Sequence, residues 1–458
     1  MKIITQDYLT DKRLEDSIQS FSNKFRLATF LKSCNAYKTK GFEGILLFCY
    51  LLRLAFSNRT MYMNFITGRH TEGFSKDTIY RFLNNPSINW SKFTTTLSAK
   101  IANQEILPLS SEKRRNVLII DDSTFERPRA KNVELLAKVF DHTSRRFKRG
   151  FRLLTLGWSD GNTFLPVNSR LLSSENNANV YQLPKKKYDK RTLAFKRRRQ
   201  ARTKATSVML ELLKEAKNAG IQATHVLFDT WFCSPSSVLS VKGIGYDVVA
   251  MAKKSSKIHY VFNGEKQSVK TIYQSCKKRR GRSRYLLSVD ITVEKDGESI
   301  PAKLVFIKNR NNRKDWLVLL STDVTLTEDE IIQTYGKRWD IEVFFKVCKS
   351  YLKLGKECRS LSYDAMTAHV AVVFTRYMML SIEQRRRNDQ RSLGELFFHF
   401  CDELEDVSSE QALFLIIHAV LKTAKDKLFL TNQQLDELIT SFIETLPKYI
   451  QNRLQVIA

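Results

Sequence analysis

The hydrophobic and polar positions of the chain follow a helical period through the first 110 residues. Between Phe42 and Phe56 apolar side chains almost fill the pattern, which only Glu43 and Arg53 interrupt. A stretch that is apolar on nearly every side is typical of a buried helix. We therefore expect residues 1–110 to form a helical domain.

A second helix is expected within residues 73–86. Ser75 is a suitable N-cap, the apolar residues that follow share one face, and an Asn-Pro pair stops the helix. Lys76 and Arg81 point outward, as they would on the second helix of a helix-turn-helix that contacts DNA. The alternative is one more surface helix of a small bundle, and both interpretations stay open.

From Asn116 the pattern changes to short, continuous apolar runs of the kind that buried strands show. Such runs occupy residues 117–120, 151–158, 163–167, 225–228 and 245–251. Ser159-Asp-Gly-Asn162 is a strong hairpin signal between two of them, and a helical stretch covers residues 191–219. Strands that alternate with helices in this way predict an α/β fold with a mixed sheet.

Residues 255–321 alternate short strands with turns, and the chain is helical from Thr327 onward. Asn263-Gly264 and Asp296-Gly297 favour hairpin turns, while Thr327 and Glu330 form a capping box, so a helix should start near residue 328. The predicted organisation is an N-terminal helical DNA-binding domain (1–110), a core in two parts (111–254 and 322–360), a β-rich insertion (255–321) and a C-terminal helical domain (361–458).

Composition narrows the class of protein. The chain has 76 Lys and Arg against 47 Asp and Glu, a net charge of +29, with 43% hydrophobic residues. A folded chain with this excess needs a polyanionic partner, either nucleic acid or an anionic membrane surface. Its seven cysteines lack any CxxC pair, and no apolar run approaches the ~18–20 residues of a membrane span. A reduced, cytoplasmic protein that handles nucleic acid is expected.

Two carboxylates directly follow buried strands. Asp122 ends the run at 117–120, and Asp229 ends the run at 225–228. Groups at strand ends project into the cleft where α/β proteins bind ligands, although Asp is also common there as a turn residue. Asp121 would point to the opposite face from Asp122, because side chains alternate along a strand. Periodicity does not decide which of the two faces the cleft.

A third carboxylate lies on the predicted helix. At 100° per residue, Tyr335, Arg338, Glu342 and Lys349 fall within a stripe about 60° wide, and Lys346 lies beside it. One acid among cations suits a phosphate site, with Glu342 for a metal and the other groups for oxyanions. The alternative is a solvated ladder of i, i+4 ion pairs.

These residues resemble a known family. Tyr335-x2-Arg338-x3-Glu342-x6-Lys349 is similar to the YREK signature of insertion-sequence-4-like DDE transposases, and Asp122-Ser-Thr124 and Phe228-Asp229 resemble their first two acids. The resemblance covers roughly residues 110–380. It implies an RNase H-like core in which Asp122, Asp229 and Glu342 are catalytic and bind two Mg²⁺ (or Mn²⁺) ions, which would activate the attacking oxygen and stabilise the leaving one.

The resemblance also implies a reaction and roles for individual residues. Water nicks the transposon end, and the freed 3′-OH then attacks phosphodiesters, often through a hairpin end. Arg338 and Lys349 would clamp phosphates, and Tyr335 would donate a hydrogen bond to one. Trp316 occupies the position of a base-stacking Trp, the alternative being a core residue of the insertion. Trp231 is expected to be structural.

Two basic runs predict contacts with DNA. Residues 185–204 hold Lys185, Lys186, Lys187, Arg197, Arg198 and Arg199, and residues 277–284 form the second run. Beside a phosphate-cleaving site they favour DNA tracking over a merely solvated face. The expected partners are double-stranded DNA (terminal inverted repeats and target) and a second copy of the chain in a synaptic complex, with no membrane.

The leading hypothesis is therefore a cut-and-paste transposase, found in the cytoplasm of a prokaryotic cell and at the nucleoid when bound to DNA. Two alternatives remain. One is an RNase H-like metal-dependent DNA nuclease without strand transfer, and the other is a catalytically inactive DNA-binding derivative.

Overall fold

The computed structural model describes residues 2–386 except 57–60, 67–69, 71, 112–113, 142–143, 280–282, 310–311 and 313, and then only positions 393, 431, 434, 437, 440–442 and 445. The side chains of residues 2–13, 63 and 386 are also outside the description. The helices expected at 393–404, at 412–421 and near residue 451 fall almost entirely on residues that lie outside the described part of the chain.

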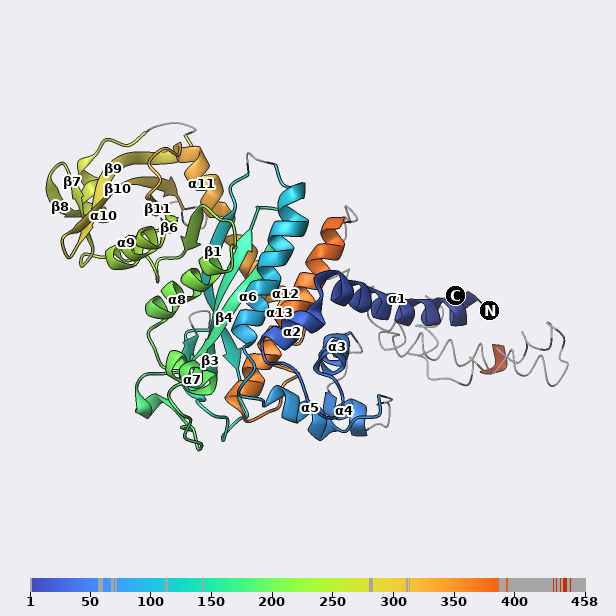
Figure 1. Ribbon diagram of the computed structural model, residues 1–458. Helices are drawn as coiled ribbons and strands as arrows, with labels where there is room; N and C mark the ends of the chain where they lie inside the picture. Colours follow the sequence, from blue (N-terminus) through green and yellow to red (C-terminus); the bar gives the residue numbers. More distant parts are fainter. Residues whose placement is uncertain are drawn as a thin grey trace.

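The N-terminal part of the chain is helical, as its periodicity predicts (Figure 1). Its helices are α1 (Lys2–Phe25), α2 (Leu27–Ser33), α3 (Gly44–Leu54), α4 (Met61–Ile66), α5 (Lys76–Leu83) and α6 (Trp90–Ile101). The buried helix expected around residues 42–56 is α3, and the expected N-cap Ser75 precedes α5. Helix α6 packs against both β4 and α13, so this part of the chain is joined to the core rather than tethered by a linker.

Within the described residues, eleven strands form one mixed sheet. The strands are β1 (Val117–Glu126), β2 (Ala137–Asp141), β3 (Arg146–Ser159), β4 (Phe164–Leu172), β5 (His225–Phe228), β6 (Asp247–Met251), β7 (His259–Phe262), β8 (Glu265–Ser268), β9 (Tyr285–Lys295), β10 (Glu298–Lys308) and β11 (Trp316–Ser321). Their order is β2-β3-β1-β5-β6-β11-β10-β9-β7-β8, with β4 also paired to β3. Strand β1 is antiparallel to β3 and parallel to β5, which is parallel to β6.

This topology has the RNase H-like arrangement, in which a central first strand separates an antiparallel hairpin from two parallel strands. The predicted α/β class and its β-rich insertion are thereby confirmed. The insertion is continuous with the core, because β11 pairs with β6 and carries β10 and β9 beyond it. Asn263-Gly264 and Asp296-Gly297 connect paired strands with positive φ at all four residues, as the two predicted hairpin turns require.

Helices cover both faces of the sheet (Figure 1). They are α7 (Leu193–Ala201), α8 (Ala205–Asn218), α9 (Pro235–Ile244), α10 (Val269–Ser275), α11 (Glu328–Gly336), α12 (Trp339–Ser350) and α13 (Tyr363–Arg386). Helices α12 and α13 lie on the face to which odd-numbered residues of β1 point, since Phe125 contacts His369 of α13 with ring centroids 6.4 Å apart. The capping box of Thr327 and Glu330 is present at the start of α11, as predicted.

Helix α13 is long and apolar enough to cross a membrane by length and composition, with 23 qualifying residues. Of its most apolar window, 94% is buried within the fold. The helix packs against α3, α5, α6 and β4, which accounts for its apolar surface. We therefore interpret α13 as a core helix, which joins the N-terminal helices to the sheet.

Candidate active site

An open groove lies where β1 outruns its parallel neighbour. Strand β5 ends at Phe228, whereas β1 continues to Glu126 beside β3. The groove has a volume of about 510 Å³. Its lining is rich in charged residues: Asp121, Asp122, Ser123, Thr124, Glu126, Phe140, Asp141, Lys148, Arg152, Asp229, Thr230, Trp231 and Lys349.

The register of the sheet places Asp121 close to Asp229. In the parallel pair β1 and β5, Ile119 lies opposite Leu227. Because side chains alternate along a strand, Asp121 points the same way as Ile119. Asp229 directly follows β5, and its charge acts on the carboxyl of Asp121. Asp122 points to the opposite face.

Arg338 connects Asp121 to Glu342. Its Nη1 lies 3.0 Å from Oδ2 of Asp121, and its Nη2 donates to Oε1 of Glu342, one turn further along. All three side chains are partly buried, with exposed fractions of 16% for Asp121 and Arg338 and 35% for Glu342. The structure therefore places Asp121, rather than the expected Asp122, with Glu342.

The environment disfavours charge on Asp121, within β1, and on Asp229, directly after β5. Burial raises the pKa of Asp121 to about 7, although Arg338 acts in the opposite direction, and the nearby charge of Asp229 raises it further. Burial also raises the pKa of Asp229, although the backbone N–H of Trp231 donates to its Oδ1 at 2.9 Å. The carboxylates are therefore close enough to repel one another, and Arg338 only partly compensates them.

The donor chemistry of these acids fits a hard divalent cation, which prefers carboxylate oxygens. In the described part of the chain, however, no three His, Cys, Asp or Glu side chains converge on one point as metal ligands would. Asp121 and Glu342 instead converge on the guanidinium of Arg338. The positive charge that the acids require is thus supplied here by an arginine.

The expected single helix from residue 328 is divided into two. Helix α11 ends at Gly336 and α12 begins at Trp339, with Lys337 and Arg338 in the joint. Tyr335, expected on one stripe with Arg338 and Glu342, has a buried hydroxyl, and burial raises its pKa. Its ring centroid lies 5.9 Å from Cζ of Arg338, so Tyr335 packs beside the arginine that holds the acids.

The two lysines of α12 have different surroundings. Lys349 lines the groove, and burial lowers the pKa of its ammonium group although Glu126 and Asp141 lie close by. Lys346 is exposed on α12 and is not part of the groove lining. Of the predicted phosphate-binding residues on this helix, Lys349 is therefore the one in the groove with the aspartates.

On the opposite face of β1, Asp122 belongs to a second group that sequence reasoning missed. Its carboxylate accepts a hydrogen bond from Nε of Arg152 on β3, and Cζ of Arg152 lies 5.1 Å from the ring centroid of Trp231. Trp231, expected to be structural, is 50% exposed and lines the groove. A signal was present in the sequence, because Arg152 is the one charged residue in the apolar run 151–158.

Trp316 is packed within the insertion. It stacks on Tyr273 with centroids 4.4 Å apart and an interplanar angle of 24°, and it contacts Phe306 edge-on. The Nζ of Lys254 lies 4.6 Å from its ring centroid. Trp316 is still partly exposed, at a shallow pocket with Lys254 and Lys270, so the base-stacking assignment stays a prediction.

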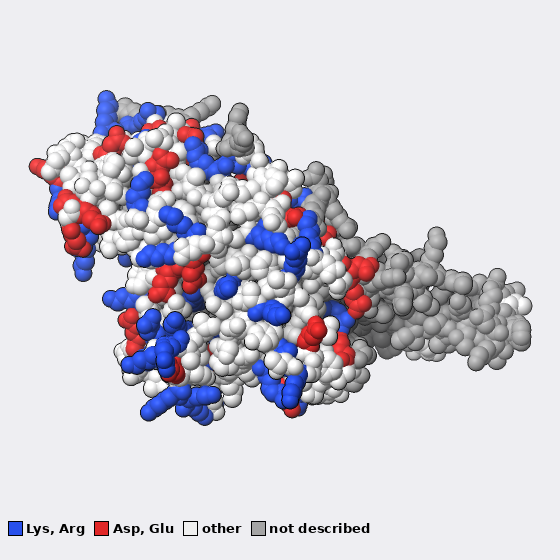
Figure 2. Space-filling model, in the orientation of Figure 1, with Lys and Arg blue, Asp and Glu red and all other residues white. Residues whose placement is uncertain are grey.

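The basic run 185–204 divides into surface lysines and buried arginines. Lys185, Lys186, Lys187 and Arg199 are exposed, and Figure 2 shows Lys and Arg gathered on this side of the molecule, near α7. Arg197 and Arg198 are only 8% and 6% exposed.

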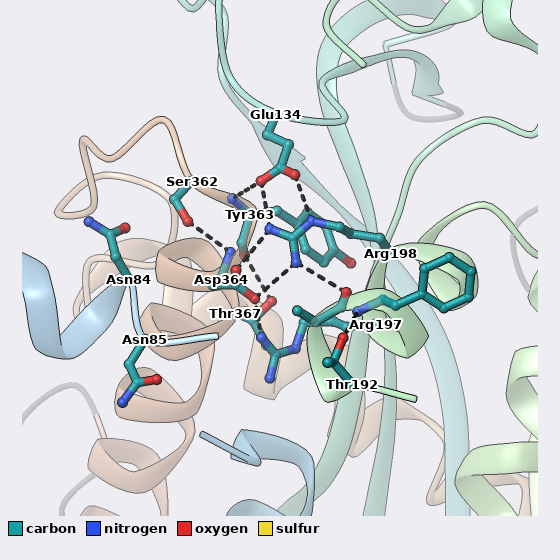
Figure 3. Close-up of polar contacts among 12 residues, drawn as sticks. Asn84, Asn85, Glu134, Thr192, Arg197, Arg198, Ser362, Tyr363, Asp364 and Thr367 are labelled. Atoms are coloured by element: carbon teal, nitrogen blue, oxygen red, sulfur yellow. Dashed lines mark hydrogen bonds and ion pairs between the residues drawn. The ribbon is translucent and has the colours of Figure 1, made fainter. Parts of the chain in front are cut away.

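The two buried arginines form ion pairs inside the fold (Figure 3). Both pair with Asp364 at the start of α13, and Arg198 also pairs with Glu134 at 2.6 Å. Arg197 in addition donates to the carbonyl of Ile88, just before α6. The expectation that Arg197 and Arg198 contact DNA is therefore wrong. Their guanidinium groups are buried in ion pairs and hydrogen bonds that connect α7 to α13 and to the N-terminal helices.

The other predicted DNA contacts lie on α5. Lys76 and Arg81 are exposed at its two ends, as the helix-turn-helix hypothesis requires. Of the second basic run, Lys277, Arg279 and Arg284 are exposed, and residues 280–282 are outside the description. These side chains are available to a polyanion, and their role stays a prediction.

An RNase H-like sheet with acids on β1, after β5 and on a helix over the same face defines a class of enzymes that cleave nucleic acid phosphodiesters. Residues 46–303 match the family model of the DDE superfamily endonucleases, and the chain belongs to this family. No curated protein matches the chain. The family acts on DNA and generally uses divalent metal ions. The match ends before Arg338 and Glu342, so the role of those residues depends on the geometry described above.

Proposed function

We propose that the protein is a DDE transposase of an insertion sequence, similar to the insertion-sequence-4-like enzymes, that cuts transposon ends and joins them to target DNA. The single observation that carries this proposal is the pairing of Asp121 and Glu342 with Arg338, with Asp229 close enough that the charge of Arg338 acts to lower its pKa. Family membership supports DNA cleavage, and the Tyr335, Arg338, Glu342 and Lys349 spacing supports the transposase subgroup.

The metal ligands would be Asp121, Asp229 and Glu342. They would hold two Mg²⁺ or Mn²⁺ ions in each active site. A divalent cation bound there lowers the pKa of the attacking water and stabilises the charge that develops on the leaving oxygen. We assign Asp121, in place of Asp122, as the first acid. Asp121 and Glu342 both pair with Arg338. Burial raises the pKa of both Asp121 and Asp229, and the charges of neighbouring acids, Asp122 among them, raise each further, so a bound cation would favour the charged carboxylates.

The basic groups in the groove and beside it would bind and orient DNA. Arg338 presents a planar guanidinium that suits a phosphate, and Lys349 supplies a second cation further along α12. The buried hydroxyl of Tyr335 would donate to a phosphate oxygen once DNA draws Arg338 toward the groove. Exposed basic residues outside the groove would contact the DNA backbone: Lys185, Lys186, Lys187, Arg199, Lys346, Lys76 and Arg81.

The assembly and location follow from this activity. We assign residues 1–110 to recognition of the terminal repeats, and residues 361–458 to contacts between two copies in a synaptic complex. The protein would act in the cytoplasm, on the nucleoid. The alternative is a metal-dependent nuclease without strand transfer. It is favoured by the description of the matching family as endonucleases.

The test uses the terminal inverted repeats that flank the coding region. With paired end DNA and Mg²⁺ we expect nicked ends, hairpin ends and products joined to a target plasmid, and we expect none of them in EDTA. Gel analysis of labelled ends separates these products. Cleavage without joined products would assign the protein to the alternative, and no metal-dependent cleavage at any end would overturn the proposed function.

A further inference from the structure

We propose that Trp231, with Arg152 held on its ring by Asp122, is a stacking platform for an unpaired nucleobase next to the phosphate that is cut. This inference deepens the proposed function, since it places the base beside the same carboxylates. It also gives Asp122 a separate role. On the face of β1 opposite to Asp121, it would position Arg152.

The first observation is the position of Trp231. The residue follows Asp229 by two positions, and its backbone N–H donates to the carboxylate of Asp229. The side chain lines the groove, and half of its surface is exposed. Of the five tryptophans, Trp90 and Trp158 are buried and Trp339 is also exposed, but Trp231 is the one that lines the groove. Its indole presents a large flat face beside the carboxylates.

The second observation is the arrangement of Arg152. Its guanidinium lies 5.1 Å from the indole centroid while its Nε donates to Asp122. Arg152 stands opposite Thr124 in the pairing of β1 and β3, on the same face of the sheet as Asp122. The arginine is therefore fixed at one end by a carboxylate and at the other by an aromatic ring, and it cannot turn away to solvent without losing both contacts.

An aromatic ring with an adjacent guanidinium has the chemistry of a nucleobase site. Bases stack on aromatic side chains with little regard to sequence, and arginine adds a cation–π contribution and a donor for the phosphate. A base must leave its pair before it can reach such a ring. Trp316 is less suited to this task in this chain, since it is stacked on Tyr273 within the insertion.

The platform is tested by binding in EDTA, where no cleavage occurs. The probes are a DNA hairpin duplex with a five-nucleotide single-stranded 3′ overhang and the same hairpin with a blunt end. Trp231→Ala is expected to weaken binding of the overhang DNA about tenfold, within the range known for stacking of one base. Binding of the blunt DNA should be unchanged, and Trp231→Phe should keep most of the preference.

The chain offers a matched control in Tyr181, which is 46% exposed and has Cζ of Arg149 4.8 Å from its ring centroid, outside the groove. Tyr181→Ala should leave the overhang preference unchanged. Asp122→Ala should lower the preference, and Arg152→Ala combined with Trp231→Ala should lower it no further than Trp231→Ala alone.

Two results would overturn the platform: overhang binding by Trp231→Ala that equals the parent protein, or an equal loss on blunt and overhang DNA. The outcome is separable from the proposed function. A protein that never cuts DNA can still show the overhang preference in EDTA, and a cutting enzyme can lack it.

Discussion

Glu342→Gln is expected to abolish metal-dependent cleavage of end DNA, by about a thousandfold or more, on the scale known for loss of charge-stabilising groups at reacting centres. Glutamine has nearly the same shape and can still accept the hydrogen bond from Arg338. It cannot supply the negative charge that a divalent cation requires. Cleavage of labelled end DNA in Mg²⁺ measures the loss, and DNA binding in EDTA should be retained.

Asp329 is a matched control for this substitution. It is an acid of the neighbouring helix α11, its side chain is 54% exposed, and it pairs at 3.6 Å with Arg284 of the insertion. Asp329→Asn removes one negative charge from the same region, and it should cut DNA at the parent rate. If Glu342→Gln still cuts, the third acid is wrongly assigned.

Asp364→Asn is expected to lower the free energy of unfolding by about 3–5 kcal/mol, the cost of removing one partner from a buried ion pair. Asp364 is 1% exposed and pairs with both Arg197 and Arg198. Without its charge, two buried guanidinium groups are left with one carboxylate, that of Glu134 (Figure 3). Urea denaturation followed by circular dichroism measures the change in midpoint.

The control is the exposed pair of Asp189 and Arg191, whose side chains are 53% and 92% exposed. Asp189→Asn also removes one negative charge that pairs with an arginine of residues 185–204. It should leave the denaturation midpoint unchanged, because exposed ion pairs contribute little to stability. If Asp364→Asn were as stable as the parent, Asp364 would not be needed to hold Arg197 and Arg198 in the core. The conclusion that these arginines do not contact DNA would then be contradicted.

Local sequence signals were sufficient for much of the fold. The apolar start of the strand that carries Asp121 and Asp122, the capping box at Thr327 and the hairpin turn at Asn263-Gly264 depend on residues close together in the chain. Their physics is that of one strand, one helix end or one turn, so the sequence carries it directly. The pattern of these elements was enough to predict an α/β fold with a mixed sheet, and the resemblance to the transposase signature implied the RNase H-like class.

Features that depend on distant residues could not be predicted. In the run 185–204, nothing local separates Arg198, which is buried against Glu134 and Asp364, from Arg199, which is exposed. The stripe that included Tyr335 assumed one continuous helix, whereas two helices meet at Lys337 and Arg338.

The choice between Asp121 and Asp122 was of the same kind. Alternation along β1 shows that the two point to opposite faces, and only the packing of α12 shows which face holds Arg338 and Glu342. Sequence alone therefore located the acids but did not orient them.

The central claim is that the acids on one face of the sheet, Asp121, Asp229 and Glu342, form the cleavage site. The most direct measurement compares Asp121→Asn and Asp122→Asn in the cleavage of end DNA with Mg²⁺. We predict that Asp121→Asn shows no cleavage, whereas Asp122→Asn cuts at a kcat near that of the parent with a raised KM. Cleavage by Asp121→Asn together with none by Asp122→Asn would contradict the account.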